Sequence, residues 1–340
     1  MTSEADTTKQ TTGEEEIISE FFAPLARGWP GAFELRDDCA AISPAPGQDL
    51  IVKTDPVRAD VHFFSDDQPQ DIAWKALAVN VSDLAAKGAR PLAYTLAVSF
   101  PAAPDPAWLR AFSDGLATAQ AAFGCVLIGG DTDHAEGPLS LAVTVFGEVP
   151  RGRMIQRATP SARDVIYVSG ALGDAALGLS IRSGQPKSKA TTQALTVEEQ
   201  YLRDRYLRPQ PRLGLRAALR AYASAAMDLS DGLGKDLGRM CRASGMGAIV
   251  EESKMPLSDA FRAAAPQSAD ARRTLTSAGD DYEILCTVKP GNSPGFEQLA
   301  ASAGIPVTPI GTMTAETGVQ LIDRGGAALD WSSQGYDHFG

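Results

Sequence analysis

The sequence predicts an α/β protein made of two domains of similar size. Apolar, β-branched runs alternate with Ala-rich runs of helical periodicity, and this alternation restarts after a basic, turn-rich connector that begins near Pro150. The chain has 340 residues, 44% of them hydrophobic, which is enough to fill two cores. We expect a disordered polar tail over residues 1–14, an N-terminal domain over 15–150 and a C-terminal domain over 151–340.

In the first half, Ala-rich runs with apolar residues at helical spacing predict helices, and β-branched apolar runs predict strands. The expected helices are 16–26, 71–88 and 106–124, and the expected strands are 48–57, 94–100, 125–133 and 139–150. The middle helix is expected to end at Lys87-Gly88, with Pro91 beyond it as a further stop signal.

The second half repeats the alternation. Residues 164–181 predict a strand, a glycine turn and a helix, and residues 183–193 predict a polar loop. Further strands are expected in 248–253, 282–288 and 306–313. Further helices are expected in 212–223 and 296–304, and another helix is expected to begin within 232–240. No short internal repeat interrupts this order.

Charge and composition exclude several classes of protein. A net charge of −11 and a pI near 4.8 argue against nucleic acid or an anionic membrane surface as the main partner, because binding to phosphate backbones needs a basic face. No apolar run approaches the roughly 18 residues of a membrane span, and the polar first residues lack the features of a signal peptide. Without any CxxC spacing, the four cysteines are expected to be buried free thiols in a reducing cytoplasm: Cys39, Cys125, Cys241 and Cys286.

Aspartates recur where apolar runs stop. They are Asp37, Asp38, Asp55, Asp83, Asp131, Asp133, Asp228, Asp231, Asp280 and Asp281. Each alone is explained by a helix cap or a turn. If these positions converge, however, the carboxylates raise one another's pKa values and destabilise the fold unless cations bind. Oxygen-only ligands suit Mg²⁺, whereas the isolated histidines His62, His134 and His338 do not suggest zinc.

The usual nucleotide motifs are missing. The segment GLGKDL lacks the first glycine and the hydroxyl of a P-loop, and VIYVSGALGDAALGL does not spell GxGxxG, so that tight packing explains it equally well. No HRD and DFG set marks a protein kinase. Phosphate transfer in this protein would therefore be organised by metal ions rather than by a P-loop lysine.

Together, these segments resemble the thiamine-monophosphate kinases, which belong to the superfamily of aminoimidazole ribonucleotide synthetase and selenophosphate synthetase. The matching stretches are DDCAAI, TDPVRADVHF, KALAVNVSDLAAKGARP, LIGGDTD, GRMIQR, MDLSDGL, SAGDDYE and GYDHF. They extend from about residue 17 to the last residues. The resemblance implies two α/β domains, with the N-terminal sheet paired across a homodimer. It also implies phosphorylation of thiamine monophosphate to thiamine diphosphate by direct transfer from ATP, with several Mg²⁺ ions.

The resemblance also assigns roles to particular residues. Metal ligands would be Asp38, Lys53 (through its backbone), Thr54, Asp55, Asp83, Asp131, Asp228 and Asp231. Nucleotide contacts would be Gly129, Gly130, Asp131, Arg157 and Ser230, with Asp131 and Arg157 closest to the chemistry. The thiamine-phosphate side would involve His62, Asp280, Trp331 and Tyr336.

Three positions qualify this assignment. The family commonly has GGED where this chain reads Ala278-Gly279-Asp280-Asp281, so the acidic contact at Asp280 is one methylene shorter. Arg36 replaces a glycine before Asp37-Asp38. Asp236 is expected to have a solvated or capping role on a helix rather than a role at the site. The alternatives are a related ATP-dependent synthetase and a nucleotide-binding maturation protein without turnover.

Overall fold

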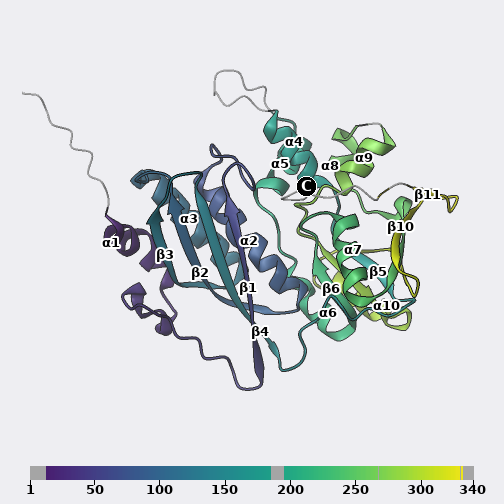
Figure 1. Cartoon of the computed structure of the whole chain (residues 1–340), viewed down its shortest axis with the longest axis horizontal. Helices are drawn as coiled ribbons and strands as arrows, with labels where there is room; N and C mark the ends of the chain where they lie inside the picture. The colour runs from purple at the N-terminus through teal and green to yellow at the C-terminus, as the bar shows by residue number, and fades with distance from the viewer. Residues whose placement is uncertain (1–12, 185–194, 267, 330, 332–340) are drawn as a thin grey trace, which may run out of the picture.

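Two separate β-sheets organise the computed structural model, which describes residues 13–184, 195–266, 268–329 and 331 (Figure 1). The first sheet has four strands in the order β1-β4-β2-β3. Its strands are β1 (Gln48–Arg58), β2 (Arg90–Phe100), β3 (Val126–His134) and β4 (Ser140–Pro150). Strand β4 pairs antiparallel with both β1 and β2, whereas β2 and β3 are parallel. Strands β1 and β3 therefore form the two edges of this sheet.

One face of this sheet is covered by two long helices, α2 (Pro69–Ala86) and α3 (Pro106–Phe123), which lie behind it in Figure 1. Both start at a proline, which needs no N–H bond in the first turn, and α3 ends at Gly124 in a left-handed conformation. Leu77 and Phe112 are fully buried between the helices and the sheet. This packing holds the C-terminal turn of α2 against the sheet.

On the opposite face of the first sheet, the 3₁₀ turns Ala23–Ala26 and Pro30–Leu35 pack against Ala93 of β2 and Ile128 of β3. Because side chains alternate along a strand, Val52 and Thr54 also point to this face, and Val52 is 56% exposed. Ala97 of β2 and Ala142 of β4 are exposed there as well. The part of this face around Val52 is thus accessible and includes small and apolar side chains.

The segment before β1 differs from the expected single helix over 16–26. It consists of α1 (Glu14–Ile17), a π-helical turn η1 (Ile18–Phe22) and a 3₁₀ turn η2 (Ala23–Ala26), followed by a second 3₁₀ segment η3 (Pro30–Leu35). Pro24 has no N–H to donate, which explains why a regular helix does not continue there. Residues 1–12 of the expected tail lie outside the described residues.

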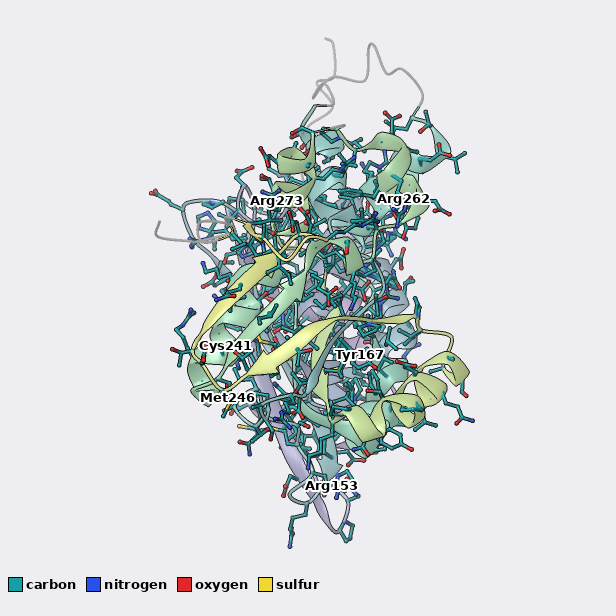
Figure 2. All side chains as sticks on the ribbon, turned by 90° about the vertical axis from the view of Figure 1, so that its right-hand side faces the viewer. Arg153, Tyr167, Cys241, Met246, Arg262 and Arg273 are labelled. Atoms are coloured by element: carbon teal, nitrogen blue, oxygen red, sulfur yellow. The ribbon has the colours of Figure 1, made fainter. Side chains whose placement is uncertain are left out.

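The second sheet has seven strands in the order β11-β10-β7-β9-β5-β8-β6. They are β5 (Val165–Ser169), β6 (Ala223–Asp228), β7 (Gly247–Glu251), β8 (Ile284–Val288), β9 (Val307–Thr314), β10 (Gly318–Ile322) and β11 (Ala328–Leu329). Only the β7–β10 pair is parallel. Figure 2 shows this half from the side, with Tyr167 of β5 between the arginines above it and Arg153 of the connector at the lower end.

Helices lie on both faces of the second sheet. They are α4 (Asp174–Ser183), α5 (Val197–Leu207), η4 (Leu213–Leu215), α6 (Arg216–Tyr222), α7 (Leu233–Ser244), η5 (Glu252–Lys254), α8 (Asp259–Ala264), α9 (Ala269–Thr276), η6 (Pro290–Asn292) and α10 (Ser293–Ser302). Leu237 of α7 belongs to one buried cluster, and Phe296 of α10 to another that also includes Ala85 and Ala86 of α2. The end of α2 therefore packs against both halves of the chain.

Most expected elements are present, and the exceptions have physical reasons. Sequence reasoning missed α5, whose apolar residues form no clear stripe, the strand β6 that ends at Asp228, and the short elements α8, α9, β10 and β11. Asp83 does not follow a strand, because it lies in the last turn of α2. Cys39 is exposed, which corrects the expectation that all four cysteines are buried. Residues 185–193 of the expected loop lie outside the described residues.

Candidate active site

Four carboxylates from both halves of the chain meet where α2 contacts the second sheet. Asp55 comes from β1, Asp83 from the last turn of α2, Asp228 from the end of β6 and Asp231 from the turn that follows. Burial raises the pKa of Asp228 well above its ordinary value, and the charge of Asp83 adds to this rise. Burial also raises the pKa of Asp55, with Asp83 and Asp231 contributing repulsion. We call these four residues the acidic cluster.

A single lysine neutralises part of the acidic cluster directly. The Lys53 Nζ atom lies 2.9 Å from Asp55 Oδ2 and 2.8 Å from Asp83 Oδ2. Burial on its own lowers the pKa of Lys53, but the charges of Asp83 and Asp55 outweigh it and raise the pKa above the ordinary lysine value. Lys53 and Asp55 are two residues apart on β1, so they project from the same face. Thr54 projects from the other face, where it accepts a hydrogen bond from Thr144 at 3.0 Å.

The turn after β6 is fixed by a carboxylate that sequence reasoning placed on the surface. Asp236 is 0% exposed and accepts hydrogen bonds from the backbone N–H groups of Ser230 (3.0 Å) and Asp231 (2.9 Å). Arg239 pairs with it at 2.8 Å. Burial raises the pKa of Asp236 to about 6. Of the two expected roles, the solvated one was wrong and the capping one is observed, because the first turn of α7 faces inward and the Asp236 side chain caps the loop.

Glycine is required where this turn meets the segment before β8. Gly232 has φ +105°, and a Cβ atom there would lie 2.0 Å from the Ser277 carbonyl oxygen. The Asp280 N–H donates to the Ser230 carbonyl at 2.9 Å. Asp280 itself has φ +63°, an uncommon conformation for a residue with a side chain. The two loops are thus locked together at the edge of the acidic cluster.

Asp280 has a buried partner that sequence reasoning missed. The Lys75 Nζ atom lies 3.0 Å from Asp280 Oδ2, and the Lys75 side chain is only 2% exposed. The same ammonium group lies 3.7 Å from the centroid of the Tyr206 ring. A lysine on the apolar face of α2 was the available signal, because a buried lysine needs an anionic partner. This pair holds Asp280, the expected substrate contact, in one place.

Three of the expected nucleotide residues, Gly129, Gly130 and Asp131, line a different cavity at the opposite edge of the first sheet, whereas Arg157 and Ser230 lie outside it, in the connector and in the turn after β6. A cavity of about 290 Å³ is lined by Asp37, Asp38, Gly129, Gly130 and Asp131, among others. A side chain at Gly130 would meet the Leu96 carbonyl oxygen at 1.9 Å, so the strand must pass close to β2 there. The exposed Asp131 carboxylate accepts the N–H of Thr132 at 3.0 Å. Asp131 lies within β3 rather than after it.

The structure does not bring all the expected metal ligands together. Asp55 and Asp131 are on edge strands separated by β4 and β2, which corresponds to roughly 14 Å at ordinary strand spacing. In the described part of the chain, no group of three or more His, Cys, Asp or Glu side chains is placed to hold a metal ion. The donors themselves are all oxygen atoms with an excess of negative charge, which fits a hard cation such as Mg²⁺.

Two cations lie near the acidic cluster. Arg157 is exposed in the connector between the sheets. Lys87, at the end of α2, donates from Nζ to the Ala226 carbonyl at 2.7 Å. Burial together with the charge of Arg157 lowers the pKa of Lys87 to about 8, while Asp228 and Asp83 oppose this shift. Sequence reasoning treated Lys87 only as a helix stop signal, and its proximity to the cluster depends on the contact between the two halves.

The remaining expected residues are those assigned to the thiamine-phosphate side, His62, Trp331 and Tyr336. His62, in the loop after β1, accepts the Arg58 N–H at Nδ1 (3.1 Å). Trp331 is 7% exposed, packs against Gly234 of α7 and donates to the Ser277 hydroxyl at 2.6 Å. Tyr336 lies outside the described residues. A substrate contact by any of them stays a prediction.

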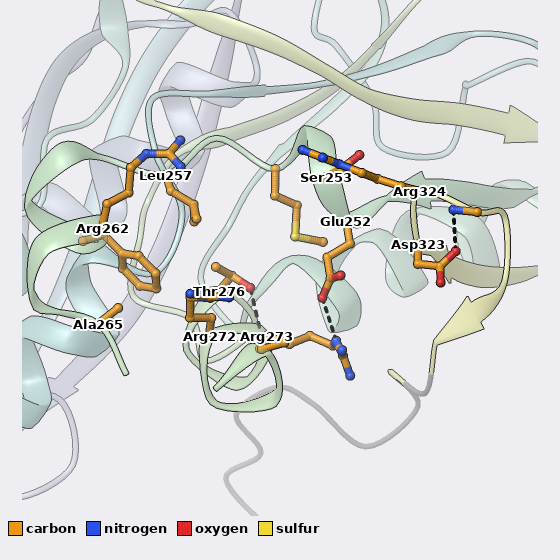
Figure 3. A pocket seen from close by; sticks show the side chains of 14 residues that line it. Glu252, Ser253, Leu257, Arg262, Ala265, Arg272, Arg273, Thr276, Asp323 and Arg324 are labelled. Atoms are coloured by element: carbon orange, nitrogen blue, oxygen red, sulfur yellow. Dashed lines mark hydrogen bonds and ion pairs between the residues drawn. The ribbon is translucent and has the colours of Figure 1, made fainter. Parts of the chain in front are cut away.

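A further cavity, of about 600 Å³, does not include any member of the acidic cluster. It lies between α8, α9 and the loop after β10, and Figure 3 shows Arg262, Arg272, Arg273 and Arg324 around it. Arg273 is paired with Glu252 at 2.9 Å. The cavity of about 290 Å³ is lined by aspartates, whereas the cavity of about 600 Å³ is lined mainly by arginines among its charged residues. The two cavities therefore have opposite electrostatic character.

Comparison with known proteins identifies the family to which the chain belongs. Residues 36–149 match the model of the AIR synthase related protein N-terminal domain, and residues 162–324 match that of the C-terminal domain. The chain therefore belongs to the AIR synthase related proteins. Within them it belongs with the thiamine-monophosphate kinases: that of Salmonella typhimurium is 42% identical over 303 residues, which cover 89% of this chain and 90% of the relative.

Solved structures agree with this placement. The thiamine-monophosphate kinase from Stenotrophomonas maltophilia has 40% sequence identity and a TM-score of 0.78, and the match covers 87% of this chain and 91% of that one. AaThiL, solved in complex with AMPPCP and TMP, has 26% identity and a TM-score of 0.76, with 87% and 89% covered. The expected fold of two AIR synthase-type domains is confirmed.

Proposed function

We propose that the protein transfers a phosphoryl group directly from ATP to thiamine monophosphate and forms thiamine diphosphate. The observation that carries this proposal is the acidic cluster, in which four carboxylates from both halves of the chain converge and Asp55 and Asp83 share one ammonium group. Such a cluster is suited to binding cations that carry phosphate groups. The similarity to thiamine-monophosphate kinases along nearly the whole chain supports the same reaction.

The chemistry does not require a general base. The acceptor is a phosphate monoester, whose second pKa of about 6 leaves it largely dianionic at neutral pH. The barrier arises from the approach of two anions, and positive charge that is fixed in position lowers it. Arg157 and Lys87 supply such charge beside the acidic cluster. Gly129 and Gly130 let a nucleotide phosphate approach the backbone, while Asp280 and His62 are assigned to the thiamine-phosphate side.

Magnesium is part of the proposal. When bound, it would supply positive charge that offsets the repulsion between two phosphate groups. The residues that would hold it are Asp55, Asp83, Asp228 and Asp231, together with the expected ligands Asp38, Lys53 through its backbone, Thr54 and Asp131. The carboxylates of the acidic cluster fit by their chemistry, because their donors are oxygen atoms, whereas the Thr54 side chain projects from the other face of β1 and Asp38 and Asp131 line the separate cavity.

A homodimer and a cytoplasmic location complete the proposal. The accessible part of the first sheet around Val52, which is 56% exposed, is suited to pairing with a second copy. Free cysteines and the use of ATP agree with a reducing compartment. In the described part of the chain, no helix is long and apolar enough to cross a membrane.

One assay tests the reaction. Purified protein with ATP, Mg²⁺ and thiamine monophosphate is expected to form thiamine diphosphate, measured by chromatography. The variant Asp131→Asn is expected to lose turnover while its far-UV circular dichroism is unchanged. The assignment is wrong if wild-type protein that demonstrably binds ATP forms no product. Near-normal turnover by Asp131→Asn would instead make Asp131 a structural residue. The alternatives, a related synthetase or a maturation protein, would give no thiamine diphosphate.

A further inference from the structure

The Lys53 ammonium group occupies a position suited to a metal ion. It lies between two carboxylates that the proposed function assigns to metal binding, at 2.9 Å from Asp55 Oδ2 and 2.8 Å from Asp83 Oδ2. A magnesium ion bound to the same oxygens would lie about 2.1 Å from each of them. The ammonium group and such an ion cannot both occupy the space between these two oxygens.

The surroundings explain why a cation is needed there even without metal. Asp231 also repels Asp55, and the buried Asp228 and Asp83 repel each other. Asp231 pairs with Arg239, whereas Asp55 and Asp83 both pair with Lys53. Without this ammonium group, the four carboxylates would face each other with no cation between Asp55 and Asp83.

The Lys53 side chain is also free to leave. It is 32% exposed at the edge strand β1, and Asp55 beside it is 44% exposed. Lysine carries its charge on a flexible four-carbon stem without fixed hydrogen-bond directions, so it can exchange partners at low cost. A guanidinium group or a fully buried lysine such as Lys75 would be held much more firmly.

We propose that Lys53 is a tethered counter-cation, which bridges Asp55 and Asp83 in the metal-free protein and is displaced when a divalent cation binds. This inference rests on the proposed function, because it concerns the same metal site, and it adds a competition between a side chain and the metal. Lys53 thereby stabilises the empty site and sets the divalent-cation concentration needed to fill it.

The competition predicts two opposite effects of removing the charge. Lys53→Met should bind Mn²⁺ more tightly than the wild type, because the ion no longer displaces an ammonium group. Since both ion pairs are partly exposed, we expect a gain of roughly tenfold in affinity. The same variant should have a lower Tm in EDTA, and added Mg²⁺ should raise its Tm more than that of the wild type. Lys53→Arg, which keeps the charge on a group that is held more firmly, should bind Mn²⁺ no more tightly than the wild type and should keep the wild-type Tm in EDTA.

The experiment measures free Mn²⁺ by electron paramagnetic resonance during titration of the full-length protein without nucleotide, alongside Tm in EDTA and in Mg²⁺. Lys254→Met is the matched control, because it removes one lysine that pairs with Glu251 at 2.7 Å far from the acidic cluster. This control should leave Mn²⁺ affinity unchanged. Tighter binding by Lys53→Met alone supports the inference.

Equal or weaker Mn²⁺ binding by Lys53→Met overturns it, as does the absence of Mn²⁺ binding in every variant. These outcomes are separable from failure of the proposed function. An active wild type with unchanged Mn²⁺ affinity in Lys53→Met removes only the counter-cation role. Tighter Mn²⁺ binding by Lys53→Met in a protein that forms no thiamine diphosphate supports the counter-cation and removes the kinase assignment.

Discussion

The acidic cluster is a partly exposed carboxylate site and the surroundings of Glu283 are a buried one, and the two are compensated very differently. Glu283 is 0% exposed and accepts hydrogen bonds from Arg205 (3.0 Å), Arg212 (2.6 Å) and Ser169 (2.6 Å). In the acidic cluster, by contrast, Asp55 and Asp83 share the single cation Lys53. A fully compensated carboxylate holds the fold together, whereas an under-compensated one leaves capacity for a ligand.

The largest expected effect is on the compensated side of this comparison. Glu283→Ala should lower the free energy of unfolding by about 3–5 kcal/mol, because two buried arginines would lose their anionic partner. Urea denaturation followed by circular dichroism measures this loss. A decrease below about 1 kcal/mol would mean that Arg205 and Arg212 find other partners, and that the contrast between the two sites is smaller than the geometry indicates.

A member of the acidic cluster should behave in the opposite way. Asp228→Asn should reduce kcat/KM by roughly 100-fold or more, because it removes a charge from the proposed metal site. Its Tm in EDTA should not fall, since burial and repulsion from Asp83 already disfavour the charged form. Steady-state kinetics and thermal unfolding measure the two effects. A large fall in Tm with normal turnover would make Asp228 a structural residue like Glu283.

Asp236 sharpens the comparison, because it lies beside the acidic cluster but is compensated in the manner of Glu283. Asp236→Ala should cost about 1–3 kcal/mol, since two backbone N–H groups and Arg239 would lose their acceptor. Turnover should fall as well, because the turn that carries Asp231 would loosen. Denaturation and kinetics on the same preparation measure both, and an unchanged free energy of unfolding would contradict the capping role.

The last prediction concerns pH. Burial raises the pKa of Asp281, whose carboxylate accepts the Gly173 N–H, from 3.8 to about 8. Between these values the folded state binds more protons than the unfolded state, so this group makes stability fall as pH rises from about 4 to about 8. This group contributes at most about 1.4 kcal/mol per pH unit to the slope of the unfolding free energy against pH. Asp281→Asn should flatten the fall of Tm between pH 5 and pH 8, and an unchanged slope would contradict the assignment.

Sequence reasoning predicted the regular elements well where local pattern decides them. The strand at β1 and the helices α2 and α3 follow from their periodicity and end signals. Helix α5 was missed because its burial depends on α4 and α8 rather than on an apolar stripe of its own. Asp236 was misplaced for a related reason, since only the packing of α7 shows which side of its first turn faces inward.

The features of the candidate site can likewise be divided into those that the sequence could predict and those that it could not. The order of the aspartate-containing motifs, visible in the sequence, was sufficient to indicate the family and to name Asp55, Asp83, Asp131 and Asp228. The sequence could also place Lys53 on the same face of its strand as Asp55, because strand side chains alternate. It could not reveal that Asp83 reaches the same ammonium group from a helix.

The sequence by itself therefore determined the secondary structure of the long elements, the family and the identity of most candidate carboxylates. Only the tertiary structure decided which carboxylates are compensated. The pairs Lys75–Asp280, Lys53–Asp83 and Arg212–Glu283 join residues that are distant in the chain. Coulomb interactions depend on separation in space and on burial, and neither quantity is set until the two halves pack against α2.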